Sequence, residues 1–194
     1  EMILKENKKP MNTPSIFKKI CDLLELTEED YTNQIGDYYK DHNKEGIVVK
    51  VTEDGKNGLI LSLYEMTSND WTDIIYDGSL PTSRLDGETN TKLIKSRNNY
   101  QAEFPSVAWI SNLGEEWYLP AIDEWVTIIR EKDIINAALI KLSRTPISNA
   151  NYISSHLEKG SNGITDEYYH YYIEFNGSTF SGACNYKVRA IAKF

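Results

Sequence analysis

Apolar runs on either side of a turn-forming segment constrain the fold of this chain most strongly. Residues 46–51 and 59–64 are rich in Val, Ile and Leu, as strands are. Between them, residues 54–58 consist mainly of Gly, Asp and Asn, which favour turns. The sequence therefore predicts a β-hairpin with a loop longer than two residues.

The apolar spacing changes twice after this hairpin. Four helical segments are predicted, starting at Asn90 or Thr91, at Pro105, at Pro120 and at Ile134. Strand-like segments follow at residues 152–155, 168–175 and 188–194, with a tight-turn signal at Asn176-Gly177. A hairpin, then helices, then strands predicts an α+β fold with antiparallel strands.

The first 34 residues differ from the rest of the chain. Residues 1–12 are polar and rich in Lys, and Thr13-Pro14 then reads as a helix start. An apolar stripe at helical spacing follows, formed by Ile16, Phe17, Ile20, Cys21 and Leu24. We therefore expect an N-terminal extension over residues 1–34 and a main domain over residues 35–194.

Charge and composition exclude several classes of protein. The net charge is -8, which disfavours binding to nucleic acid and docking on anionic lipid. No segment approaches the roughly 20 apolar residues of a membrane span, so no membrane insertion is expected from this segment. The chain opens on the polar sequence from Glu1 to Pro10, in which no signal peptide is visible. The sequence indicates no oligomeric state.

Several segments, in the same order along the chain, resemble one family. The most specific is Trp117-Tyr118-Leu119-Pro120-Ala121-Ile122-Asp123-Glu124. The others are residues 35–39, 44–48, 54–62, 86–91 (DGETNT), 104–109, 152–155 (YISS) and 187–194 (KVRAIAKF). Together they resemble bacterial surface proteins related to the major paralogous domain and to the C-terminal domain of collagen-like adhesins.

This resemblance implies a C-type-lectin-like fold with two main helices over residues 35–194. It also implies a gut-type bacterial source, secretion as a lipoprotein or surface protein, and an adhesive role. Ile153 stands where the family carries Trp, and Trp125 stands where Leu is usual; both are hydrophobic exchanges. The sequence has no Glu-Pro-Asn, Gln-Pro-Asp or Trp-Asn-Asp triplet, so calcium-dependent sugar binding is not supported and no cofactor or metal is expected.

The segment 168–175 provides the predicted ligand-binding face. Strand alternation places Tyr171, Ile173 and Phe175 toward the core, and Tyr168, His170, Tyr172 and Glu174 outward. Aromatic rings and carboxylates can stack on and bond to a sugar. The predicted ligand-binding residues of this segment are Tyr168, His170, Tyr172 and Glu174. Phe180, Asn185 and Tyr186 are added because the segment that follows resembles the variable, ligand-facing surface of some lectin-fold receptors. Alternatively, the N-terminal helix, the loop 156–167 or a second subunit covers this face.

Enzymatic alternatives have weaker support in the sequence. Formylglycine-generating enzymes share the fold but need paired cysteines, and Cys184 has no cysteine near it in the sequence. The acidic residues around Pro120 fit a glycosidase pair or, more simply, a helix start: Glu115, Glu116, Asp123 and Glu124. His42, His156 and His170 lack metal-ligand spacing. The leading hypothesis is a non-enzymatic, calcium-independent module for a glycan or host glycoprotein; an enzyme on the same fold and a structural surface subunit are the alternatives.

Overall fold

The computed structural model describes residues 32–68, 81–161, 166–173, 179–181 and 186–194. The chain divides into two compact units, Glu1–Thr32 and Asn33–Phe194, and all elements below belong to the second. The sequence predicts the start of this domain at residue 35. Several sequence-based expectations fall outside the described residues, among them the helix from Thr13 with Cys21 on its apolar stripe, the Asn176-Gly177 turn, Cys184, and the predicted ligand-binding residues Glu174 and Asn185.

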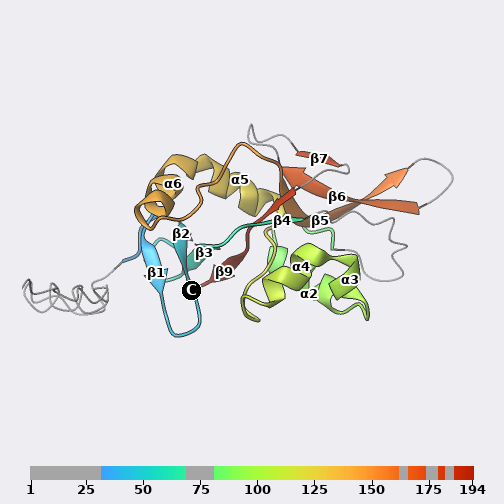
Figure 1. Cartoon of the computed structure of the whole chain (residues 1–194), viewed down its shortest axis with the longest axis horizontal. Coiled ribbons are helices and arrows are strands. Elements are labelled where there is room, and N and C mark those ends of the chain that lie inside the picture. Colours follow the sequence, from blue (N-terminus) through green and yellow to red (C-terminus); the bar gives the residue numbers. More distant parts are fainter. Residues whose placement is uncertain (1–31, 69–80, 162–165, 174–178, 182–185) are drawn as a thin grey trace, which may run out of the picture. The chain divides into compact units, whose positions relative to one another are not determined.

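The predicted hairpin forms the centre of the first sheet (Figure 1). The sheet is antiparallel in the order β1-β2-β3-β9, with β1 (Tyr38–Lys40), β2 (Glu45–Val51), β3 (Gly58–Ser62) and β9 (Ile191–Lys193). Val48 on β2 pairs with Ile60 on β3, which confirms the hairpin.

Both faces of this sheet are buried. Successive side chains of a strand point to opposite faces. Val48 and Ile60 belong to one core cluster, whereas Ile47 and Leu61 belong to another. The consecutive apolar residues Ile47–Val49 and Leu59–Leu61 are therefore explained by a sheet with a hydrophobic core on each side.

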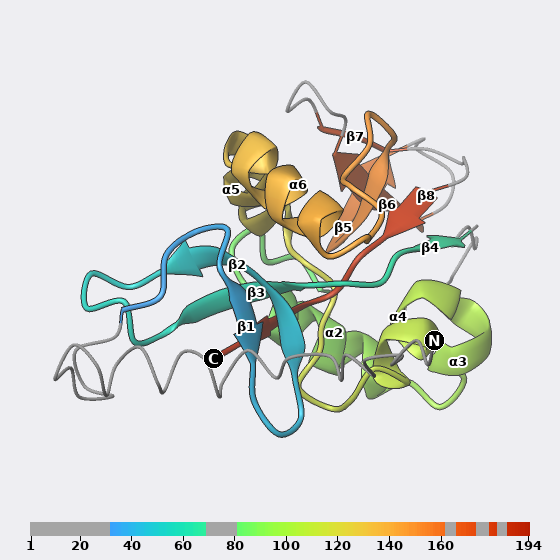
Figure 2. The ribbon, with the colours of Figure 1, turned by 60° about the vertical axis from the view of Figure 1, so that its left-hand side comes forward.

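Two groups of helices supply these cores. The described part of the chain contains α2 (Gly87–Lys95), α3 (Tyr100–Glu103), α4 (Pro105–Ser111), α5 (Ile122–Arg130) and α6 (Lys132–Lys141). Ile94 and Ile110, from α2 and α4, pack with Val48, while Trp125 and Leu139, from α5 and α6, pack with Ile47. Figure 2 shows the two groups on opposite sides of β1–β3. The described helices thus number five, where the resemblance implies two main ones; none is long and apolar enough to cross a membrane.

The second sheet is assembled from distant parts of the chain. Its order is β4-β8-β5-β6-β7, with β4 (Met66–Ser68), β8 (Tyr186–Val188), β5 (Tyr152–Ser161), β6 (Asp166–Ile173) and β7 (Thr179–Ser181). Its pairs are antiparallel except for one parallel contact, between Tyr152 and Lys187. Between Ile153 and Leu157 the register of β5 shifts against β6. The two sheets and the helices confirm the predicted α+β fold with mainly antiparallel strands.

The single strand predicted over residues 188–194 is wrong. Arg189 and Ala190 interrupt it, and β8 and β9 belong to different sheets. Arg189 is fully buried; its Nε donates to Glu65 Oε2 at 3.0 Å and its Nη1 to the Ser62 carbonyl at 3.3 Å. Glu65 lies between β3 and β4, so the ion pair joins two segments that each pass from one sheet to the other.

Candidate functional site

The helix α2 begins at the DGETNT motif. Asp86 is its N-cap, and its Oδ1 accepts a hydrogen bond from the Thr89 backbone N–H at 2.9 Å. The expectation that Asn90 or Thr91 caps this helix is wrong, because both residues lie inside α2. The Asp86 side chain reaches the backbone N–H three residues on, as an N-cap does, and the helix therefore starts four residues before Thr91.

Asn90 and Thr91 connect α2 to other motifs instead. The Asn90 side chain accepts from the Ser83 N–H at 3.0 Å and donates to the Ser83 carbonyl at 2.7 Å and to Ser155 Oγ at 3.1 Å. Thr91 Oγ1 accepts from the Leu119 N–H at 3.0 Å. Both side chains are buried, so these bonds satisfy polar groups that water does not reach.

Glu124, in the first turn of α5, bonds to the start of α2. Its carboxylate accepts hydrogen bonds from the Gly87 N–H at 3.1 Å, the Ala121 N–H at 2.8 Å and the Tyr118 hydroxyl at 3.1 Å. Burial raises the pKa of Glu124 above its usual value, and these three donors oppose the shift. We call the contact between residues 86–91 and residues 118–124 the motif joint, because it unites two of the segments that carry the family resemblance.

Gly87 permits the close approach within the motif joint. A Cβ atom at this position would lie 2.4 Å from the Leu119 carbonyl oxygen and 2.6 Å from the Ala121 nitrogen. Both are backbone atoms, which cannot rotate away as a side chain does. Glycine is therefore required here because the two motifs touch backbone to backbone.

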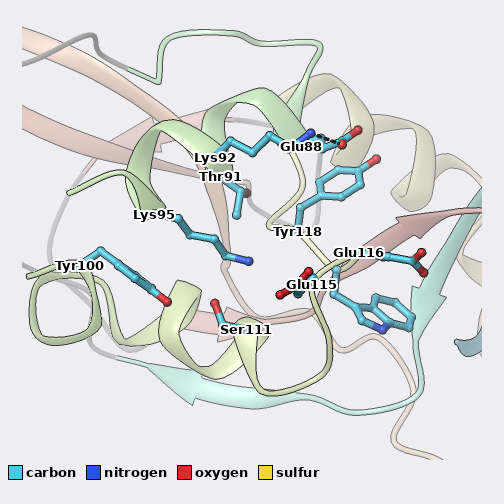
Figure 3. Close-up of a pocket in the computed structure, with 10 residues that line it drawn as sticks. Glu88, Thr91, Lys92, Lys95, Tyr100, Ser111, Glu115, Glu116 and Tyr118 are labelled. Atoms are coloured by element: carbon cyan, nitrogen blue, oxygen red, sulfur yellow. Dashed lines mark hydrogen bonds and ion pairs between the residues drawn. The ribbon is translucent and has the colours of Figure 1, made fainter. Parts of the chain in front are cut away.

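A cavity of about 370 Å³ lies above the motif joint (Figure 3). We call it the α2 groove. Its walls come from α2, α3, the end of α4 and the loop before Leu119, and its lining residues are Glu88, Thr91, Lys92, Lys95, Tyr100, Ser111, Glu115, Glu116, Trp117 and Tyr118. Ligand sites in proteins commonly have volumes of roughly 300–1,000 Å³. The groove is therefore large enough for a small polar ligand.

Most charges of the α2 groove neutralise one another. Glu88 pairs with Lys92 at 2.5 Å and with Lys193 at 2.6 Å, and these lysines hold the pKa of Glu88 below its usual value. Glu116 pairs with Lys44 at 3.0 Å.

Two charged groups remain in the groove. Lys95 and Glu115 make no ion pair within the described residues, and Figure 3 shows the Lys95 amine pointing across the cavity toward the Glu115 carboxylate. The groove thus presents one cation and one anion to a ligand.

A second cavity shares three of its lining residues with the first. Its volume is about 560 Å³, and it is lined by His42, Asn43, Lys44, Gly114, Glu115, Glu116 and Trp117. The segment Glu115–Trp117 lines both cavities. The two cavities therefore lie next to each other at this segment.

The ligand-binding residues predicted from the sequence lie elsewhere. Tyr168, His170 and Tyr172 are on β6 and Phe180 is on β7, where the strand register pairs Tyr172 with Phe180. Glu174 and Asn185 lie outside the described residues. Whether β6 and β7 bind a ligand stays a prediction.

Tyr186 was expected among the ligand-facing residues, and the structure places its side chain in the core. It is fully buried, in the same cluster as Val188. Lys187, between them, is only partly buried. The alternation of a short strand therefore points the Tyr186 ring inward and gives Lys187 the more accessible face.

The acidic residues considered for catalysis have separate positions. Asp123 and Glu124 lie in the first turn of α5, as the helix-start interpretation predicts, and Asp123 pairs with Arg84 at 3.4 Å. Glu115 and Glu116 line the groove. Within the ranges that the structure describes, no three His, Cys, Asp or Glu side chains are grouped so that they could hold a metal ion.

Sequence reasoning missed the α2 groove. One signal was available: on a helix, residues 88, 91, 92 and 95 share a face, and all four are polar or charged. The facing residues Tyr100, Ser111 and Glu115 come from other elements, which helical periodicity does not bring together. No protein-family model matches the chain, and no curated protein matches it.

Proposed function

We propose that this chain is a non-enzymatic binding module with a C-type-lectin-like fold, secreted or anchored at a bacterial surface as a lipoprotein. Its ligand is a glycan or a host glycoprotein, bound without calcium in the α2 groove. Support for the fold comes from the collinear motifs between residues 35 and 194. Two of them, 86–91 and 117–124, meet in the motif joint, and Ser155 of a third bonds to Asn90.

The composition of the α2 groove carries the proposal. It combines the aromatic ring of Tyr100 with the hydroxyl of Ser111 and two charged groups that have no ion-pair partner within the described residues, Lys95 and Glu115. Sugars present apolar ring faces together with hydroxyl groups, which such a mixture of side chains recognises. A polar ligand can therefore replace the water that solvates these groups.

Glu124 supports binding over acid–base chemistry. A buried carboxyl with a raised pKa resembles a catalytic acid. In this protein its carboxylate accepts three hydrogen bonds from the motif joint, two of them from backbone N–H groups. These bonds fix the start of α5 against the start of α2, which is a structural role.

A glycan array tests the proposal when it is probed with the wild type and with a variant that fills the groove. Ser111→Tyr places a ring in the cavity, and we expect it to abolish binding to the glycans that the wild type retains. Asn112→Tyr is the matched control, because Asn112 is exposed, adjacent in sequence and not part of the lining. Binding in EDTA should equal binding in calcium.

Each other outcome assigns the function differently. Binding that survives Ser111→Tyr but is lost in Tyr172→Ala would move the site to β6 and β7. Absence of any glycan ligand would reject the proposed function, and a specific protein crosslinked on intact cells would then favour a structural subunit. Turnover of a glycoside that stops in Glu115→Gln would favour the enzyme.

A further inference from the structure

We infer that the α2 groove selects a sugar that bears a carboxylate, and that Lys95 binds this carboxylate. The inference rests on the proposed function, because it specifies the ligand class for the same groove.

Lys95 is the groove cation that remains available. The other lining lysine, Lys92, is held by Glu88 at 2.5 Å. Lys95 is the last residue of α2; it is half-buried and makes no ion pair within the described residues. Its amine points into the cavity (Figure 3). A partly desolvated ammonium attracts an anionic group more strongly than an exposed one does, because water screens it less.

The groups around Lys95 fit a sugar better than they fit a simple anion. Glu115 faces Lys95 across the cavity and repels a second negative charge, but its oxygens accept hydrogen bonds from hydroxyl groups. The Ser111 hydroxyl donates to the Val107 carbonyl at 2.9 Å and keeps its lone pairs for a ligand donor. A ring with one carboxylate and several hydroxyls therefore complements both sides of the groove.

A matched pair of probes isolates the carboxylate. Methyl β-glucuronide and methyl β-glucoside differ only in a carboxylate against a hydroxymethyl group. We would titrate each into the full chain and follow the amide signals by NMR, which detects millimolar affinities. A charge-assisted hydrogen bond predicts that the glucuronide binds about tenfold more tightly, and that high salt reduces this preference.

Two substitutions with the same change of charge assign the preference to a residue. Lys95→Gln should remove the preference, so that the two glycosides bind this variant with about equal affinity. Lys141→Gln is the control. Lys141 is the last residue of α6, as Lys95 is of α2, but it is exposed and lies outside the groove. It should retain the full preference for the glucuronide.

The possible failures are distinguishable. Equal affinity for the two glycosides, unchanged in Lys95→Gln, would overturn the inference and leave the proposed function standing. Tighter binding of alanine than of the glucuronide, lost in both Lys95→Gln and Glu115→Gln, would overturn it in favour of a zwitterionic ligand. No shift of groove amides with either glycoside would contradict the proposed function itself.

Discussion

The motif joint and the α2 groove are adjacent, but they use polar residues in opposite ways. In the joint, Glu124 and Thr91 accept hydrogen bonds from backbone N–H groups, and their partners are buried with them. In the groove, Lys95 and Glu115 face a cavity and form no ion pair within the described ranges. Polar groups bonded inside the protein stabilise its fold, whereas groups left facing a cavity are available to a ligand.

The two motifs of the joint differ from the groove in what their residues do. The motifs 86–91 and 117–124 are accounted for largely by the contacts of the joint. Thr91 and Tyr118 contribute to both regions, because the outer surface of the joint is the floor of the groove. The two motifs therefore account for the folded contacts beneath the α2 groove. The residues that line the groove determine which ligand it binds.

The largest difference between the two regions should come from their glutamates. Glu124→Ala leaves two buried backbone N–H groups and the Tyr118 hydroxyl without their acceptor, which should cost about 3 kcal/mol of unfolding free energy. Glu115→Ala removes an exposed side chain and should change it by less than about 0.5 kcal/mol. Urea denaturation measures both; equal effects would break the distinction between joint and groove.

A smaller effect is expected from a hydroxyl within the joint. Thr91→Val keeps the shape of the side chain but removes the acceptor of the buried Leu119 N–H, so about 1–2 kcal/mol should be lost. Ser111→Ala, in the groove wall, should cost less than about 0.5 kcal/mol. Thermal unfolding of the two variants provides the comparison, and a neutral Thr91→Val would show that water replaces the lost bond.

The contributions of Glu124 and Asp86, two carboxyls of the motif joint, to stability should change with pH in opposite directions. Burial raises the pKa of Glu124 in the folded state, so its contribution is fully present below the usual value of 4.5 and declines as pH rises through the folded pKa. The hydrogen bonds from Thr89 lower the pKa of Asp86, so its contribution is present above 3.8 and declines as pH falls.

Measured against pH, the destabilisation caused by Glu124→Ala should therefore shrink toward neutral pH. The destabilisation caused by Asp86→Ala should shrink toward acid pH, and it should be the smaller of the two because Asp86 is exposed. Unfolding curves collected at a series of pH values give both slopes. Parallel slopes for the two variants would contradict the different surroundings assigned to these carboxyls.

The smallest effect on stability is expected from Lys95 in the α2 groove. Lys95→Gln removes a side chain without an ion pair in the described part of the chain, so the unfolding free energy should stay within about 0.5 kcal/mol of the wild type. The same chemical denaturation experiment tests this. A large loss would mean that Lys95 supports the fold, and binding data on this variant would then need a different explanation.

The sequence predicted those parts of the fold that depend on local pattern. The hairpin follows from apolar runs around a Gly- and Asp-rich loop, and α4 and α5 begin near Pro105 and Pro120. The continuous strand over 188–194 was wrong because a buried ion pair between Arg189 and Glu65, 124 residues apart in sequence, decides where the chain changes sheets.

The candidate site was less predictable for a related reason. The polar face of α2 is visible at helical spacing, but its facing residues come from α3, α4 and the loop that follows. Four-residue helices such as α3 (Tyr100–Glu103) are too short to produce a periodic pattern. Only the packing of these elements shows that Tyr100 and Glu115 line the same cavity as Lys95.

The central claim is that the motif joint stabilises the fold and the α2 groove binds the ligand. The most direct test is to map the amide chemical shifts with methyl β-glucuronide and with methyl β-glucoside. We predict shift changes concentrated in residues 88–95, in Tyr100 and in residues 111–117. The unfolding free energy of Lys95→Gln should stay close to that of the wild type. Shift changes confined to β6 and β7, or no change with either sugar, would contradict the account.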